Sequence, residues 1–230
     1  MTALRSALFL VWFLAITTLL SLVFLPVLAL PRKATVWLAR LWARWTFWGL
    51  KVFAGIGWEI RGTVPNGPVL VAAKHMSMWD TLALYLALNE PAIVLKRELL
   101  HIPFYGWFLA KAAAIPIDRG AGASALRKMA EAARKVLAQA RPILIFPEGT
   151  RKKPGAPPDY KPGVAGLYGQ LDVDCVPVAL NSGVYWTGFL KRPGTIVLQF
   201  LEPIGPGLKR DAFMRQLESR IETATNRLLP

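Results

Sequence analysis

The chain opens with a long apolar run. No charged residue lies between Arg5 and Arg32, and Ala7–Leu30 carries only three hydroxyl groups as polar side chains. At about 1.5 Å per residue, a helix over this segment is about 36 Å long, enough to cross a hydrocarbon core of about 30 Å. A cleaved signal peptide has a shorter apolar region, of about 7–15 residues, so the pattern favours a membrane anchor.

The next segment, Ala34–Ile56, combines basic and aromatic residues. Basic side chains spaced by seven, four and seven share one helical stripe: Lys33, Arg40, Arg44 and Lys51. Four tryptophans accompany them: Trp37, Trp42, Trp45 and Trp48. Basic side chains near lipid phosphates and indoles at the headgroup level are typical of an interfacial helix. We therefore expect residues 1–56 to form an N-terminal two-helix membrane-anchoring motif.

Two placements fit these residues. Positive charge after the apolar run exceeds that before it, which puts the rest of the chain in the cytoplasm if the first helix spans. This placement predicts attachment to the inner (cytoplasmic) membrane, with the catalytic domain on the cytoplasmic side. Pro26 fits a second placement, a helical hairpin that enters one leaflet without crossing. Both make the lipid bilayer a partner.

From Gly57 onward, short β patterns alternate with helical patterns. The predicted strands are Trp58–Arg61, Val69–Ala73, Ala92–Leu95, Ala113–Ile117, Ile143–Phe146, Cys175–Leu180 and Thr195–Leu201. The predicted helices are Met78–Asn89, Tyr105–Ala112, Ser124–Ala140, Val164–Leu171 and Asp211–Leu229. This alternation predicts that residues 57–230 form an α/β domain, with a mixed sheet flanked by helices.

Composition narrows the function classes. With 54% hydrophobic residues and a net charge of +14, the chain suits an anionic membrane surface or nucleic acid. The apolar anchor favours the membrane, and no nucleic-acid-binding motif is present, so we expect no nucleic-acid partner. Two histidines and one cysteine, Cys175, predict no metal site and exclude an intramolecular disulfide. A serine hydrolase is disfavoured because the chain has no G-x-S-x-G string.

His75 precedes Asp80 by five residues, directly after a predicted strand. The structural interpretation is a capping box, with Ser77 as N-cap and Asp80 at the third helical position. This does not explain His75. In the functional interpretation His75 lies in the loop before the helix, accepts a proton from a hydroxyl, and is oriented by Asp80.

A second string, Phe146–Arg151, ends another predicted strand. Pro147 and Gly149 indicate a turn, which we expect to expose Glu148, Thr150 and Arg151 at the carboxyl end of the sheet. The planar guanidinium of Arg151 suits a phosphate. Lys96 and Arg119 also follow predicted strands. Val176-Pro177-Val178 is an apolar strand whose proline suggests a sheet edge or bulge.

In this order, the His75–Asp80 pair, the basic segment ending at Arg119, the Phe146–Arg151 string and Val176–Val178 resemble the four successive blocks of the glycerolipid acyltransferases. The resemblance runs from about Gly62 to Leu180 and is strongest to the bacterial 1-acylglycerol-3-phosphate branch. Lys74 departs from the asparagine that many members carry there.

The resemblance implies that a fatty acyl group passes from an acyl thioester to the free hydroxyl of 1-acylglycerol-3-phosphate, forming phosphatidic acid. His75 and Asp80 would be catalytic. Glu148 and Gly149 would hold the glycerol, beside Thr150, and Lys96, Arg119 and Arg151 the phosphate. It implies no cofactor; acyl-CoA or acyl carrier protein supplies the acyl group to a lysophospholipid acceptor. Another lysolipid, such as lyso-ornithine lipid, or glycerol-3-phosphate itself, is an alternative acceptor.

Overall fold

A seven-stranded sheet forms the centre of the computed structural model, which describes residues 1–102, 104–118, 120 and 122–230. The strand order is β1-β9-β6-β2-β5-β3-β4. β6 and β9 pair antiparallel and the other neighbours pair parallel, so the sheet is mixed, as the sequence predicted. The strands are β1 (Ile56–Arg61), β2 (Leu70–Ala73), β3 (Ala92–Lys96), β4 (Ile115–Ile117), β5 (Ile143–Ile145), β6 (Cys175–Leu180) and β9 (Gly194–Phe200).

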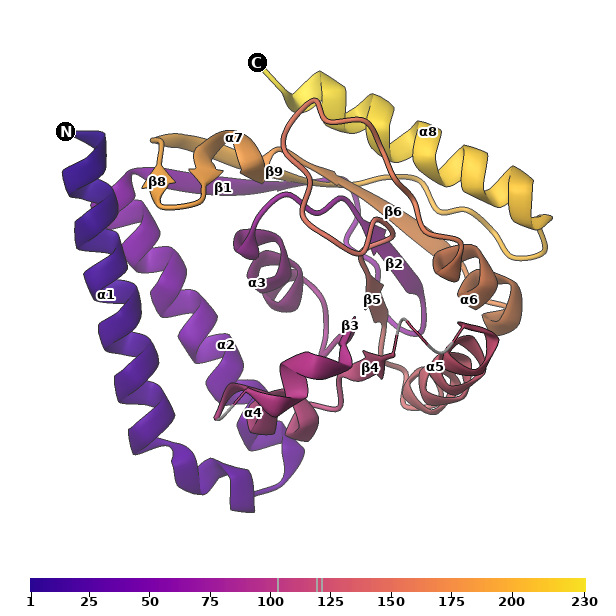
Figure 1. Ribbon diagram of the computed structural model, residues 1–230, viewed down its shortest axis with the longest axis horizontal. Helices are drawn as coiled ribbons and strands as arrows, with labels where there is room; N and C mark the ends of the chain where they lie inside the picture. Colours follow the sequence, from indigo (N-terminus) through magenta and orange to yellow (C-terminus); the bar gives the residue numbers. More distant parts are fainter. Residues whose placement is uncertain (103, 119, 121) are drawn as a thin grey trace.

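Helices cover both faces of this sheet (Figure 1). Successive strand residues point to opposite faces. Val71 and Ala73 of β2 join the core under α3 (Met78–Ala87), whereas Leu70 and Ala72 join the core under the other helices. Those helices are α5 (Gly122–Leu137), α6 (Gly163–Leu171) and α8 (Arg210–Leu228). The result is a three-layer α/β/α arrangement with two apolar cores.

The N-terminal residues form a helical hairpin beside α3 (Figure 1). It consists of α1 (Thr2–Val23), η1 (Leu25–Ala29), α2 (Arg32–Gly49) and η2 (Leu50–Ala54). The prediction of one helix over Ala7–Leu30 is wrong at both ends. The helix begins at Thr2 and ends before Pro26, which cannot donate a helical hydrogen bond. Its 22 residues are long and apolar enough to cross a membrane.

Both ends of this hairpin contact the α/β domain. At the start of α1, the amide N–H of Lys191 donates to Ser6 Oγ at 2.8 Å; Lys191 belongs to β8 (Leu190–Lys191). At the turn between α1 and α2, Arg32 forms an ion pair with Glu90 in the loop after α3. The hairpin therefore lies lengthwise against the domain instead of projecting from it.

Arg40 fastens α2 to α3. Its guanidinium donates to the carbonyls of Tyr85, Leu86 and Leu88 at 3.3, 3.0 and 3.2 Å. The last carbonyls of a helix lack intrahelical partners and form the negative end of its dipole, which attracts a cation. The prediction that Arg40 belongs to a lipid-facing stripe is therefore wrong, whereas Arg44 is exposed.

From Gly57 onward, every predicted strand and helix is present, with small shifts at the ends. The sequence did not reveal four short elements: η3 (Arg97–His101), α7 (Ser182–Tyr185), β7 (Trp186–Thr187) and β8. It did predict α4, which spans Tyr105–Lys111. Pro177 is not at a sheet edge, because β6 lies between β9 and β2. The ladder with β9 stops at Val178, so the missing N–H of Pro177 falls just beyond that pairing.

Candidate active site

Four neighbouring parallel strands bring the predicted site residues together. The strands β2, β5, β3 and β4 are adjacent, so their carboxyl ends share one edge of the sheet. His75 follows β2, the Phe146–Arg151 string begins directly after β5, and Lys96 ends β3. Arg119 follows β4 in the sequence but lies outside the described residues.

His75 and Asp80 are in contact. Nδ1 of His75 lies 3.0 Å from Oδ2 of Asp80, and the imidazole stacks on the Phe146 ring with 3.9 Å between centroids. His75 is 12% exposed and Asp80 is fully buried. A neutral imidazole that donates from Nδ1 has an unprotonated Nε2. The pair can therefore present a base to a hydroxyl that approaches the sheet edge.

Asp80 also closes the capping box of α3. Its Oδ2 accepts the backbone N–H groups of Met76 at 2.6 Å and Ser77 at 2.8 Å, and Ser77 Oγ accepts from Trp79 N at 3.2 Å. The capping box is confirmed, and the His75–Asp80 contact is the one that the functional interpretation requires. The same carboxylate that begins the helix holds His75, so the imidazole is fixed relative to α3.

Ser182 is a contributor that sequence reasoning missed. Its hydroxyl, at the start of α7, hydrogen bonds to Oδ1 of Asp80 and lies 2.8 Å from Ser77 Oγ. Ser182 and Asp80 are 102 positions apart in the chain. No local pattern connects them, and only the pairing of β6 with β2 brings Ser182 to this place.

Phe146–Gly149 forms a tight turn. Gly149 N donates to Phe146 O at 2.9 Å, with Pro147 in the position that its fixed φ favours. Gly149 has a φ of 65°, a left-handed conformation that glycine adopts readily because it has no Cβ atom. Thr150 and Arg151 emerge from this turn exposed, as predicted.

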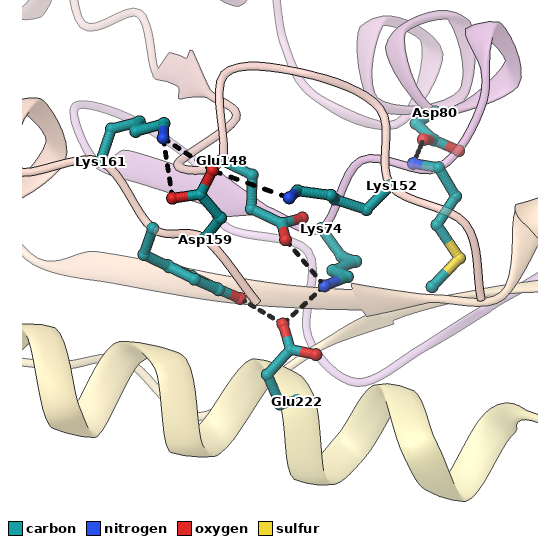
Figure 2. Close-up of polar contacts among 9 residues, drawn as sticks. Lys74, Asp80, Glu148, Lys152, Asp159, Lys161 and Glu222 are labelled. Carbon is teal, nitrogen blue, oxygen red and sulfur yellow. Dashed lines mark hydrogen bonds and ion pairs between the residues drawn. The ribbon is translucent and has the colours of Figure 1, made fainter. Parts of the chain in front are cut away.

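Glu148 is buried, so the expectation that this turn exposes it was wrong. The carboxylate is 1% exposed and lies 3.1 Å from Nζ of Lys74, which is 2% exposed (Figure 2). Burial raises the pKa of Glu148, and the positive charge of Lys74 opposes that rise. Lys74 carried no predicted role. The loop after Arg151 and helix α8 cover this carboxylate, and neither cover is apparent from a local turn pattern.

The exposed part of the edge is rich in positive charge. Lys96 and Arg151 are exposed, and Arg97 pairs with Asp118 at 3.4 Å. Desolvation raises the pKa of Tyr105 on α4, and the positive charge of Arg151 opposes that rise. An anion that approached this edge would meet charges from several strands.

An apolar cavity of about 470 Å³ lies between the hairpin, α3 and α4, on the α3 side of the His–Asp pair but not lined by it. Thr81, which follows Asp80 directly, contributes to its wall, as do Trp42 of α2 and Tyr105 of α4. This volume is within the range typical of small-molecule sites, about 300–1,000 Å³. Tyr105 therefore borders both the cavity and the charged edge where Arg151 lies.

This fold and site define a class: α/β proteins that hold an imidazole–carboxylate pair at a charged sheet edge beside an apolar cavity. Residues 57–181 match the family model described as Acyltransferase. The chain belongs to this acyltransferase family, as the four sequence blocks predicted.

The chain is similar to curated relatives from bacteria and mammals. The 1-acyl-sn-glycerol-3-phosphate acyltransferase of Pseudomonas aeruginosa is 38% identical over 171 residues, which cover 73% of this chain and 65% of that protein. The 1-acyl-sn-glycerol-3-phosphate acyltransferase alpha of Mus musculus is 31% identical over 164 residues, which cover 67% of this chain and 57% of that protein. The chain thus spans less than two thirds of the length of either relative.

A solved structure has the same fold. The crystal structure of the 1-acyl-sn-glycerophosphate acyltransferase PlsC from Thermotoga maritima aligns with a TM-score of 0.80 and 21% identity. The alignment covers 99% of this chain and 98% of that one, so the shared fold includes the N-terminal hairpin.

Proposed function

We propose that the protein transfers a fatty acyl group from a thioester to the free hydroxyl of 1-acylglycerol-3-phosphate, forming phosphatidic acid. The observation that carries this proposal is the His75–Asp80 contact at a basic sheet edge, beside an apolar cavity. The names of the relatives support the same acceptor. The acyl donor is acyl-CoA or acylated acyl carrier protein.

In this reaction His75 is the general base. Nε2 takes the proton of the acceptor hydroxyl while its oxygen forms a bond to the thioester carbonyl carbon. The carbon–sulfur bond then breaks. The departing thiolate accepts from the imidazolium the proton that came from the acceptor hydroxyl. Asp80 stabilises the transient imidazolium because its carboxylate contacts Nδ1. No covalent acyl-enzyme forms.

The basic edge is the proposed phosphate site. Arg151 and Lys96, with Arg119, bind the acceptor phosphate, and Thr150 is a polar neighbour of Arg151. A bidentate guanidinium suits phosphate geometry. For Glu148, the family resemblance implied contact with the glycerol, together with Gly149. Its burial supports a different task, holding the turn from which Thr150 and Arg151 emerge.

The apolar cavity is the proposed acyl-chain site, and the hairpin is the proposed route to the bilayer. Apolar side chains on the hairpin are exposed: Leu8, Val11, Leu14, Leu19, Leu22, Trp37, Trp45 and Trp48. Since both ends of the hairpin contact the domain, we infer that it enters one leaflet and returns. As a separate part of the proposal, the domain lies on the cytoplasmic face of the inner membrane.

The product's mass tests this function. Purified protein in lipid or detergent is given lysophosphatidic acid and an acyl thioester, beside His75→Ala and His101→Ala variants. His101 is exposed, so it is a matched control. We expect phosphatidic acid from the unmutated protein and from His101→Ala, and none from His75→Ala. Product from His75→Ala at the normal rate contradicts the assignment of the base.

Acceptor competition tests the alternatives. If lysophosphatidic acid yields no product with either donor, but lyso-ornithine lipid or glycerol-3-phosphate does, the acceptor is wrong and the His75 mechanism stands. Mass spectrometry of each reaction distinguishes these outcomes, because each acceptor gives a product of different mass.

A further inference from the structure

A buried charge cluster lies directly behind the loop that carries His75. Nζ of Lys74 is 3.1 Å from Oε1 of Glu148 and 2.7 Å from Oε1 of Glu222 on α8. The hydroxyl of Tyr160 donates to the same Glu222 oxygen at 2.8 Å. Figure 2 shows Lys74 between the two carboxylates, which come from segments far apart in the sequence.

Packing alone does not account for this cluster. A lysine is almost never fully buried unless it is paired, and burying an ion pair costs several kcal/mol per ion in desolvation. Replacing all members of such a cluster with apolar side chains is often neutral or stabilising, whereas removing one member alone is strongly destabilising. A buried pair of this kind is best attested where it specifies one arrangement among several.

The cluster contacts the two strand ends that flank the imidazole of His75. Lys74 is the residue before His75, and its backbone N–H donates to Val178 O at 2.9 Å. Glu148 is two residues after Phe146, whose ring stacks on His75. The Lys74–Glu148 pair therefore joins the ends of β2 and β5 on the two sides of the imidazole.

Glu222 extends this link to the C-terminal helix. It is the α8 residue that meets Lys74, and its side chain is 18% exposed. Without Glu222, the ammonium would keep only the Glu148 carboxylate among the ion pairs of the described residues. Glu222 thus connects α8 to Lys74, the residue before His75, in the loop that carries the base.

We propose that Lys74 and Glu222 are positioning residues, which couple helix α8 to the orientation of His75 through Glu148. This inference rests on the proposed acyl transfer for its kinetic consequence. In this proposal they act without contacting the reacting groups. They act on turnover through His75 and Phe146, and leave acceptor binding unchanged because the basic edge is formed by other side chains.

Kinetics of Lys74→Met, Glu222→Gln and the double variant test the coupling. We expect each single variant to lower kcat about 10- to 100-fold, the loss typical of a small misplacement of a reacting group, with acceptor KM changed less than about twofold. The double variant leaves the buried Glu148 carboxylate without a cation, so we expect it to be less stable than Glu222→Gln and to regain no turnover. Glu131→Gln, which breaks an exposed pair with Lys135, is the matched control and keeps full activity.

Unchanged kcat in folded Lys74→Met, or a double variant with the parental kcat despite its lower stability, overturns the proposal in favour of a purely structural role. A measurement other than activity tests the coupling of α8 to His75 independently of the proposed function. The chain has two histidines, so nitrogen-15 NMR of labelled protein in detergent resolves His75 with His101 as internal reference.

We expect the ring signals of His75 to shift in Lys74→Met and Glu222→Gln while those of His101 stay in place. Unshifted His75 signals in both variants overturn the positioning role. If the unmutated protein shows no acyl transfer to any acceptor but the His75 signals still shift, the proposed function fails and the coupling stands.

Discussion

Oδ2 of Asp80 lies 3.0 Å from Nδ1 of His75 and 2.8 Å from the backbone N of Ser77. One carboxylate oxygen therefore serves both the candidate base and the first turn of α3. This shared contact explains how a base can be held rigidly in a loop. Because Asp80 belongs to α3, the helix holds the loop that carries His75 in one conformation.

Asp80→Asn should separate these two tasks. The asparagine oxygen can still accept from Ser77 N–H, but the side chain is neutral and cannot stabilise an imidazolium. We expect kcat to fall about 10²- to 10⁴-fold, the usual contribution of general acid–base catalysis, with little change in the thermal midpoint. Steady-state kinetics and thermal unfolding measure the two effects.

Ser77→Ala gives the complementary result. The variant loses the side-chain oxygen that accepts from Trp79 N–H, and it keeps the His75–Asp80 contact. We expect a loss of about 0.5–2 kcal/mol in the free energy of unfolding, as for other N-caps. The fall in kcat should be much smaller than in Asp80→Asn. Equal losses of kcat in both would mean that Asp80 acts only through the helix cap.

Ser182→Ala tests the contact that joins α7 to Asp80. The change removes the Ser182 donor and leaves Oδ1 of Asp80 with the hydroxyl of Ser77 at 3.2 Å, so we expect a loss of about 1–3 kcal/mol in stability and a lower kcat. Ser219→Ala on the exposed face of α8 is the matched control and should change neither quantity. A Ser182→Ala protein as stable and active as the parent would contradict the role of this hydroxyl.

Local patterns predicted the elements and the His75–Asp80 pair because both depend on short sequence separations. Periodicity defines helices and strands within a few residues, and five residues bring His75 to Asp80. Ser182 was missed because it is 102 positions from Asp80. The partnership of Lys74 with Glu222 spans 148 positions. Contacts of this range follow from strand order, which no local window contains.

The burial of Glu148 is a second feature that local sequence patterns could not predict. Proline and glycine correctly predicted a turn, and turns are usually exposed. Here the loop after Arg151 returns over the turn, where Lys161 N donates to Pro147 O at 2.9 Å. Local turn chemistry therefore gave the backbone conformation but not the surroundings of the side chain.

Arg40 and Arg44 form a matched pair of tests for the hairpin. Arg40→Ala removes three contacts to the α3 carbonyls, so we expect a loss of about 1.5–3 kcal/mol in stability. Arg44→Ala should leave stability unchanged and weaken binding to anionic vesicles by about 1 kcal/mol. Unfolding and vesicle sedimentation measure the two effects. If Arg40→Ala instead weakened vesicle binding and left stability unchanged, Arg40 would lie at the lipid surface.

Lys191 should make stability depend on pH. Its ammonium lies over the Trp186 ring at 4.5 Å and bonds to the carbonyls of Gly188 and Phe189. Burial lowers the pKa of Lys191 to about 8, below the value of about 10.4 for an exposed lysine. The unfolded chain therefore binds this proton more tightly than the folded protein does.

Because unfolding takes up a proton between these two pKa values, the free energy of unfolding should rise from pH 8 to about pH 10. Above pH 10 the opposite slope begins, since burial raises the pKa of phenols such as Tyr85. Lys191→Met should flatten the rise between pH 8 and 10, as measured by the thermal midpoint in one detergent. If the variant shows the parental slope, Lys191 is not the source of the pH dependence.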